Sequence, residues 1–284
     1  MTDQYVVAGH PVEHSQSPFI HAEFARQTGQ SLHYGRLLCP LDGFETTLRE
    51  FARGSSAGPA LGCNVTTPFK FEALRLCSAS SARAALAGAA NTLRFDASGW
   101  YADNTDGAGL ICDIEKGAGV ALAGRRILLV GAGGAAAGVL GPLLASRPAL
   151  LVVANRSLAK AQALVERHRG AAKAGPVLLR AAGLGDCGGA FDVIVNATAT
   201  SLQGTAAPVD PAVLAPGALA LDLMYGPLAA PFLAWARDHG AVGRDGLGML
   251  VEQAAAAFHL WRGVRPETAS VLAKLRRRLA GGAA

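Results

Sequence analysis

Residues 126–136 of this 284-residue chain read Arg-Ile-Leu-Leu-Val-Gly-Ala-Gly-Gly-Ala-Ala, and this stretch decides the fold. Four apolar residues, 127–130, predict a short buried strand, and the small residues after it predict a tight turn that opens a helix. The order Gly-x-Gly-x-x-Ala in this context is typical of a dinucleotide-binding loop. Gly131 allows the turn, Gly133 lets the backbone approach a pyrophosphate, and Ala136 lets the helix pack closely on the strand.

Short apolar segments recur on the C-terminal side of this stretch, and helical or loop segments separate most of them. They cover residues 151–154, 177–179, 193–195, 219–223 and 241–244. Strands that alternate with crossover helices are the signature of a parallel sheet. We therefore expect a Rossmann-type, doubly wound domain over residues 106–251.

Residues 1–105 carry strand and helix patterns in a less regular order, so we place a domain boundary near residue 106. Residues 252–284 fall in a stretch that reads as two helices, and we expect them to return and complete the first domain. The expected fold is thus two α/β domains with a cleft between them. The chain would cross twice between the domains, which would allow them to close over a ligand.

The residues after the second strand of the Rossmann-type pattern discriminate between cofactors. An NAD-binding protein usually carries Asp or Glu there, which binds the ribose 2′-hydroxyl. This chain has Asn155-Arg156-Ser157 instead, with Lys160 one turn later. A guanidinium and an ammonium suit a 2′-phosphate, so the sequence predicts NADP(H). The alternative is that Arg156 only solvates the end of the strand.

Composition excludes several other classes of protein. Hydrophobic residues make up 51% of the chain, which is enough for a sizeable core and excludes intrinsic disorder. Five scattered cysteines without a Cys-x-x-Cys pair favour reduced thiols over disulfides, and we expect no metal site. Residues 127–145 are uncharged, but their glycines and proline argue against a membrane span. Without a signal peptide at the N-terminus, a cytoplasmic location is expected.

The net charge of +5 is concentrated at the C-terminus, because residues 252–284 hold six basic and two acidic residues, a net of +4. The run Lys274-Leu-Arg-Arg-Arg278 lacks interleaved aromatic residues, which favours a solvated helix face over a nucleic-acid-binding surface. We therefore expect no nucleic-acid partner and no membrane partner, and a monomer or homodimer that acts on a small molecule.

Polar residues at turns of the first domain indicate a second site. Ser15 and Ser17 lie on a loop that leads into a helix, and a helix N-terminus attracts anions. Capping of that helix by Ser17 is the alternative explanation. Lys70 stands just inside a helix that opens near Pro68, where the helix dipole disfavours a cation, so we expect it to have a partner or a task.

Together these motifs resemble the shikimate dehydrogenase family. The matching stretches are residues 14–18, 64–70, 88–92, 104–107, 131–135, 155–157, 196–198, 222–225 and 245–253. They occur in order over almost the whole chain. Residues 64–70 and 245–253 are the most specific of them.

The resemblance implies an NADP-dependent oxidoreductase that reversibly reduces 3-dehydroshikimate to shikimate, a step of chorismate and aromatic amino-acid biosynthesis. It implies Lys70 and Asp106 as the catalytic pair. The implied substrate-binding residues are Ser15, Ser17, Thr66, Lys70, Asn91, Asp106, Tyr225 and Gln253. The implied cofactor-binding residues are Gly131, Ala132, Gly133, Gly134, Ala135, Asn155, Arg156, Ser157, Lys160, Leu223 and Gly246.

A lysine suits this chemistry because hydride addition to a ketone develops negative charge on the carbonyl oxygen. A cation within hydrogen-bonding reach stabilises that charge and can deliver the proton. In the reverse direction the same pair would remove the hydroxyl proton. Whether Lys70 acts as an acid and base or as an electrostatic polariser stays open at this stage.

The chain departs from the family pattern at two places. Ala82 stands where many members have an acidic residue, and Ser157 and Lys160 replace the more usual Thr and Arg. Two alternative functions remain. One is a related enzyme that acts on quinate or another cyclic acid, with NADP or NAD, and the other is a non-catalytic nucleotide sensor. Retention of both Lys70 and Asp106 argues against the sensor.

Overall fold

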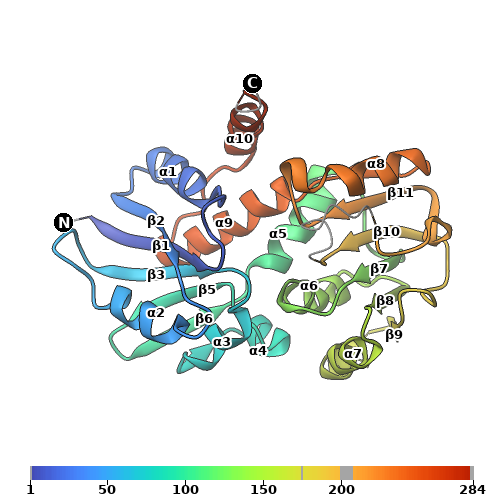
Figure 1. The fold of residues 1–284 in the computed structure, drawn as a ribbon, viewed down its shortest axis with the longest axis horizontal. Helices are drawn as coiled ribbons and strands as arrows, with labels where there is room; N and C mark the ends of the chain where they lie inside the picture. The colour runs from blue at the N-terminus through green and yellow to red at the C-terminus, as the bar shows by residue number, and fades with distance from the viewer. Residues whose placement is uncertain (1, 174, 199–206, 282–284) are drawn as a thin grey trace. The chain divides into compact units, whose positions relative to one another are not determined.

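The chain folds into two compact units, each built on its own sheet (Figure 1). The computed structural model describes residues 2–173, 175–198 and 207–281. The first unit comprises Met1–Gly109 and Leu250–Ala284, and the second comprises Leu110–Met249. The two points of division fall within α5 (Asp106–Cys112) and α9 (Leu247–Arg262). The predicted α/β class, with the C-terminal helices in the first unit, is confirmed.

The first unit contains a six-stranded mixed sheet in the order β2-β1-β3-β5-β6-β4. The strands are β1 (Asp3–Gly9), β2 (Leu32–Leu38), β3 (Ala60–Val65), β4 (Ala79–Ser80), β5 (Thr92–Asp96) and β6 (Gly99–Asp103). β1 pairs in parallel with β2 and β3, whereas β5 runs antiparallel to β3 and β6. The helices are α1 (Ser17–Thr28), α2 (Phe44–Ala52), α3 (Lys70–Arg75), α4 (Ala82–Ala87), α10 (Ala269–Gly281) and the C-terminal part of α9.

Alternate residues of β1 bury opposite faces of this sheet, as the period of a strand requires. Tyr5 and Val7 pack with Tyr34 on one face, while Val6 and Ala8 join the core that includes α2 on the other. Figure 1 shows α1 and α2 on the two sides of the sheet. Both faces are therefore covered.

The C-terminal part of α9 is held to this sheet by Trp261 and Arg262. The ring centroid of Trp261 lies 4.7 Å from that of Tyr5, and its indole Nε1 donates to the Leu93 carbonyl at 2.9 Å. The Arg262 guanidinium pairs with the Asp3 carboxylate at 2.5 Å. Residues from both ends of the chain thus complete one core.

The second unit contains a six-stranded, fully parallel sheet in the order β12-β11-β10-β7-β8-β9. The strands are β7 (Arg126–Val130), β8 (Leu150–Ala154), β9 (Leu178–Ala182), β10 (Phe191–Asn196), β11 (Leu214–Asp222) and β12 (Val242–Arg244). The helices and helical turns are η1 (Asp113–Gly117), α6 (Gly134–Ala145), α7 (Leu158–Lys173), η3 (Pro211–Val213), η4 (Gly226–Leu228) and α8 (Ala230–Asp238). Numbered along the chain, these strands have the Rossmann order, with its reversal point between β7 and β10.

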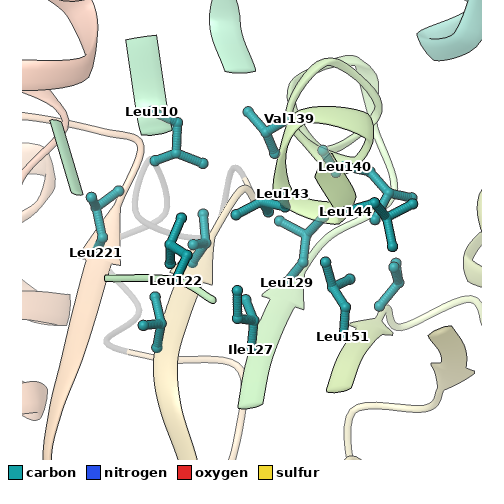
Figure 2. Close-up of a cluster of buried hydrophobic side chains, with 14 of the residues drawn as sticks. Leu110, Leu122, Ile127, Leu129, Val139, Leu140, Leu143, Leu144, Leu151 and Leu221 are labelled. Atoms are coloured by element: carbon teal, nitrogen blue, oxygen red, sulfur yellow. The ribbon is translucent and has the colours of Figure 1, made fainter. Parts of the chain in front are cut away.

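Apolar side chains cover both faces of the parallel sheet, because its strands are buried on both sides. Figure 2 shows one face, where Ile127 and Leu129 of β7 meet Val139 and Leu143 of α6. Phe232 of α8 belongs to the core on the other face. Within the described residues, no helix is long and apolar enough to cross a membrane.

A buried ion pair joins the beginning and the end of the second unit. The Arg244 guanidinium contacts both carboxylate oxygens of Asp113, at 2.9 and 2.5 Å, and Asp113 opens the π-helical turn η1. A Cβ at Gly248 would overlap the Asp113 carboxylate, and one at Gly117 would overlap the Arg244 guanidinium. These two glycines are therefore required by the space that the ion pair occupies.

His21 of α1 is fully buried among aromatic rings in the first unit. Its ring stacks on Tyr34, with centroids 4.1 Å apart and planes 7° apart. Among the described residues, neither ring nitrogen has a hydrogen-bond partner of acceptable geometry. Burial lowers the pKa of His21 to about 3, against a smaller opposing effect of the Asn64 side chain. The imidazole is therefore neutral in the folded protein.

This neutral histidine predicts a loss of stability in acid. Below a pH of about 6.5 the unfolded chain binds a proton at His21 that the folded chain rejects, so stability falls by up to about 1.4 kcal/mol per pH unit. In urea unfolding, His21→Phe should gain about 1–2 kcal/mol relative to the wild type between pH 7.5 and pH 5. His33→Gln, which removes an exposed histidine from the same unit, is the control. A difference between His21→Phe and wild type that does not vary with pH would contradict the prediction.

Candidate active site

An ion pair between Lys70 and Asp106 lies at the centre of the first unit's polar residues. Lys70 is the first residue of α3 and Asp106 the first of α5. Lys70 Nζ lies 2.5 Å from Asp106 Oδ2, and the two side chains are only 14% and 7% exposed. Lys70 thus has the partner that its unfavourable place at a helix N-terminus led us to expect.

The side chain of Asn91 holds the second oxygen of that carboxylate. Asn91 Nδ2 donates to Asp106 Oδ1 at 2.8 Å and to Thr105 Oγ1 at 2.9 Å, and it lies 3.2 Å from Gln253 Oε1. Asn91 Oδ1 accepts a hydrogen bond from the Thr105 backbone at 2.8 Å. The structure therefore brings four predicted residues together: Lys70, Asn91, Asp106 and Gln253.

A second buried carboxylate fixes the turn that leads to Asp106. Asp103 accepts hydrogen bonds from Arg83 Nε at 2.7 Å, from Ser81 Oγ at 2.6 Å and from the Asn104 backbone at 2.7 Å. Burial raises the pKa of Asp103, but the bonds from Arg83 and Ser81 outweigh it and hold the pKa below its usual value. Asn104 Oδ1 in turn accepts from the Asp106 backbone at 3.2 Å.

The predicted cap of α1 by Ser17 is wrong. The N-cap residue is Gln16, without a side-chain capping bond, and Ser17 is already the first helical residue. Ser15 Oγ donates to Ser17 Oγ at 3.2 Å, so the two hydroxyls are neighbours. The Ser15 carbonyl accepts from the exposed Arg36 at 2.7 Å, which ties the loop to β2. The serines are thus paired next to a helix N-terminus, where Ser15 Oγ also accepts from the Ser17 backbone amide at 3.3 Å.

Thr66 follows directly after β3, and its loop is held close to β1. The Thr66 backbone donates to the Ala8 carbonyl at 2.9 Å. A Cβ at Gly9 would overlap the Thr66 methyl group, so a glycine is needed there. Asn64, two residues earlier, carries buried polar contacts that the sequence did not mark as functional. In the sequence, only the place of Asn64 in the family-matching stretch 64–70 pointed to a role for it.

Tyr225, the remaining predicted substrate-binding residue, lies in the second unit. It is the N-cap residue of the turn η4, shortly after β11. A contact between Tyr225 and a substrate stays a prediction.

The glycine-rich loop of the second unit lies at the reversal point of the sheet. Gly131 has a φ of +116°, and a Cβ there would lie 2.9 Å from the Ala197 carbonyl oxygen of the loop after β10. Gly133 is the N-cap residue of α6, and within the described residues nothing lies within 4 Å of the point that its Cβ would occupy. Ala132, Gly134 and Ala135 complete the loop and the first turn of α6. Backbone amides at this helix start can therefore face an anion.

The loop after β8 presents the residues predicted to bind a 2′-phosphate. Arg156 and Ser157 are exposed between β8 and α7, and Lys160 is exposed in the first turn of α7. Asn155 Nδ2 donates to the Ser157 carbonyl at 3.0 Å, which shapes the loop. The cationic side chains of Arg156 and Lys160 therefore lie beyond the carboxyl end of β8. This strand is the neighbour of β7, which the glycine-rich loop follows.

Leu223 and Gly246, far apart in the sequence, are neighbours in the second unit. A Cβ at Gly246 would overlap the Leu223 carbonyl, and the Gly246 backbone donates to the Met224 carbonyl at 2.9 Å. Asp222 holds this loop by accepting from the Met224 backbone at 2.9 Å and from Asn196 Nδ2 at 3.1 Å. Sequence reasoning quoted Asn196 and Asp222 only as family matches and gave them no structural role.

The described part of the chain has no group of three or more His, Cys, Asp or Glu side chains that could hold a metal ion.

Comparisons with known proteins agree with this arrangement along the chain. Residues 7–93 match the family described as shikimate dehydrogenase substrate binding domain. Residues 114–204 match shikimate / quinate 5-dehydrogenase, and residues 246–276 match the shikimate 5'-dehydrogenase C-terminal domain. The first matched segment lies in the first unit and the second in the second unit, and the third lies mostly in the C-terminal part of the first unit.

Individual relatives match over almost their full length. The chain is 65% identical to a shikimate dehydrogenase (NADP(+)) of Methylibium petroleiphilum, over 96% of this chain and 94% of the relative. An Ael1 enzyme from Pseudomonas putida has a crystal structure that matches with a TM-score of 0.84 and 44% identity, over 96% of this chain and 98% of that one. A Thermus thermophilus shikimate 5-dehydrogenase, solved with NADP(H) and shikimate, matches with a TM-score of 0.84 and 32% identity, over 98% and 100% of the two chains. The chain belongs to the shikimate dehydrogenase family.

Proposed function

We propose that this protein is an NADP-dependent shikimate dehydrogenase that reversibly reduces 3-dehydroshikimate to shikimate. The observation that carries the proposal is the buried pair of Lys70 and Asp106, 2.5 Å apart and braced by Asn91. Relatives named as NADP-dependent shikimate dehydrogenases match nearly the whole chain, which supports the same reaction here. We further propose that the enzyme acts in the cytoplasm as a monomer or homodimer, without a nucleic-acid or membrane partner.

The first unit would bind the substrate. Ser15 and Ser17 would donate hydrogen bonds from their hydroxyl groups to the carboxylate, next to the N-terminus of α1, which favours an anion. Other polar side chains would contact the ring hydroxyls or line the pocket. These are Thr66, Asn91, Asp106 and Gln253 of the first unit and Tyr225 of the second.

The second unit would bind NADP(H), and its residues fit that cofactor. The open space in front of Gly133 admits a pyrophosphate against the first backbone amides of α6. Arg156 and Lys160, with Asn155 and Ser157, would hold the 2′-phosphate. The loop that contains Leu223 and Gly246 would lie near the nicotinamide end. When bound, the cofactor supplies or accepts the hydride.

Lys70 would act on the oxygen of the reacting carbonyl. Its ammonium would donate a hydrogen bond to that oxygen, stabilise the negative charge that develops, and deliver the proton. Asp106 would orient the ammonium, because one of its oxygens binds Lys70 while the other is held by Asn91. In the reverse direction Lys70 would accept the proton of the substrate hydroxyl.

Initial rates with shikimate and quinate, each with NADP and with NAD, test the proposal against its alternatives. A preference for shikimate and NADP is expected. A preference for quinate or NAD would assign the chain to a related enzyme of the same family. No turnover with any of the four combinations would favour a non-catalytic role.

Lys70→Ala should lower kcat by about two to four powers of ten, the usual contribution of a general acid and base, with a much smaller change in KM. Steady-state kinetics with shikimate measures both. Lys274→Ala is the matched control, because it removes a lysine of the same unit that pairs with Glu23 at 2.6 Å. Turnover near that of the wild type in Lys70→Ala would exclude Lys70 from the mechanism.

Ser15→Ala and Ser17→Ala should each raise KM for shikimate by about tenfold, the value of a lost hydrogen bond to a charged group, and should change kcat less. The comparison substrate is an analogue that lacks the carboxylate, for which wild type and variants should not differ. Equal use of shikimate and this analogue by the wild type would disprove the carboxylate site.

Arg156→Ala should raise KM for NADP by about 10- to 100-fold and leave the KM for NAD unchanged, because only NADP carries the 2′-phosphate. Arg237→Ala, an exposed arginine of α8 in the same unit, is the control. Equal effects of Arg156→Ala on both cofactors would show that Arg156 does not read the phosphate.

A further inference from the structure

Tyr34 lies outside the residues assigned above, although its hydroxyl binds Asn64, which in turn binds the Asn91 carbonyl. It is 6% exposed, and in the sheet register it lies opposite Tyr5 of β1. Its ring is fixed against α1 by the stack on His21, with a centroid distance of 4.1 Å. The phenol is thus held firmly between β2 and α1, and its hydroxyl has a defined place.

The Tyr34 hydroxyl determines how Asn64 is oriented. It donates to Asn64 Oδ1 at 2.7 Å, so the amide nitrogen faces the other way. There Asn64 Nδ2 donates to the Asn91 carbonyl at 3.1 Å and to Thr92 Oγ1 at 3.0 Å. Asn91 is the residue that binds Asp106. The hydroxyl therefore braces the polar network from the side opposite the catalytic pair.

The same hydroxyl also interacts with Ser17, the first residue of α1. Ser17 precedes His21 by four residues on α1, so the two side chains lie on one face of that helix. Burial raises the pKa of Tyr34 well above its usual value, and a hydrogen bond from the Ser17 side chain acts in the opposite direction. Since Ser15 Oγ donates to Ser17 Oγ at 3.2 Å, a series of hydroxyls runs from the loop to Asn64.

We propose that Tyr34 is a positioning residue that holds the Ser17 hydroxyl where the substrate carboxylate needs it and fixes the Asn64 amide against Asn91. The inference rests on the proposed role of Ser17 in binding the carboxylate. Without the Tyr34 hydroxyl, Asn64 Oδ1 is buried without its donor, and the Ser17 side chain loses its interaction with the phenol. Neither group acts on the carbonyl that reacts, so the effect falls on substrate binding.

Tyr34→Phe tests the inference, because it removes one oxygen and keeps the ring that stacks on His21. KM for shikimate should rise by about 5- to 20-fold, which equals about 1–2 kcal/mol. The variant should keep kcat within about threefold and leave KM for NADP unchanged. These two bounds reflect the loss of one buried hydrogen bond away from the reacting atoms.

Tyr5→Phe is the matched control, because Tyr5 is 1% exposed in the same unit and faces Trp261 instead of the serines. Thermal unfolding midpoints of the two variants check that each remains folded. A KM for shikimate in Tyr34→Phe equal to that in Tyr5→Phe would overturn the inference. A fall in kcat at constant KM would overturn it as well.

A double-mutant cycle with Ser17→Ala identifies the path of the effect. If Tyr34 acts through Ser17, Tyr34→Phe should change KM far less in the Ser17→Ala background than in the wild type. Equal factors in both backgrounds would show that the two residues act independently, against the inference. If Ser17→Ala raises KM and Tyr34→Phe does not, this inference alone fails. If Ser17→Ala leaves KM unchanged, the carboxylate role of Ser17 fails and the inference fails with it.

Discussion

The ion pair of Lys70 and Asp106 is almost entirely removed from solvent, and a charge can be kept in such a place only if its hydrogen-bonding atoms have partners. Asp106 meets this requirement with Lys70 on one oxygen and Asn91 on the other. Asn91 in turn lies against Thr105 and Gln253, and Gln253 comes from α9. Residues from three distant parts of the chain thus meet around this one ion pair.

A different constraint acts in the second unit. At several positions two backbone segments approach so closely that no side chain fits between them. Gly131 and Gly246 stand where a side chain would collide with the neighbouring carbonyls of Ala197 and Leu223. Gly248, in the first turn of α9, leaves room for the ion pair of Asp113 and Arg244. The glycine-rich loop and the loop of Leu223 and Gly246 are both closely packed against neighbouring backbone in this way.

Short sequence patterns were enough to predict those features that depend on residues close together in the sequence. The strand, turn and helix around Gly131 follow from spacing, and the need of Lys70 for a partner follows from the helix dipole. Long-range contacts were not predictable in this way. The clamp of Arg83 on Asp103 joins residues 20 apart, and the bond of Tyr34 to Asn64 joins residues 30 apart. The hairpin strand β6 has no clear alternation of apolar and polar residues, and only its pairing with β5 reveals it.

The first unit takes its strands and four of its helices from the beginning of the sequence, and α10 and the C-terminal part of α9 from the end. Trp261 and Arg262, which contact β5 and β1, are synthesised only after all the strands of both sheets. The ribosome therefore synthesises the residues of the second unit before the C-terminal residues that complete the first unit. Translation order thus delays completion of the first unit's core until the second unit has been synthesised.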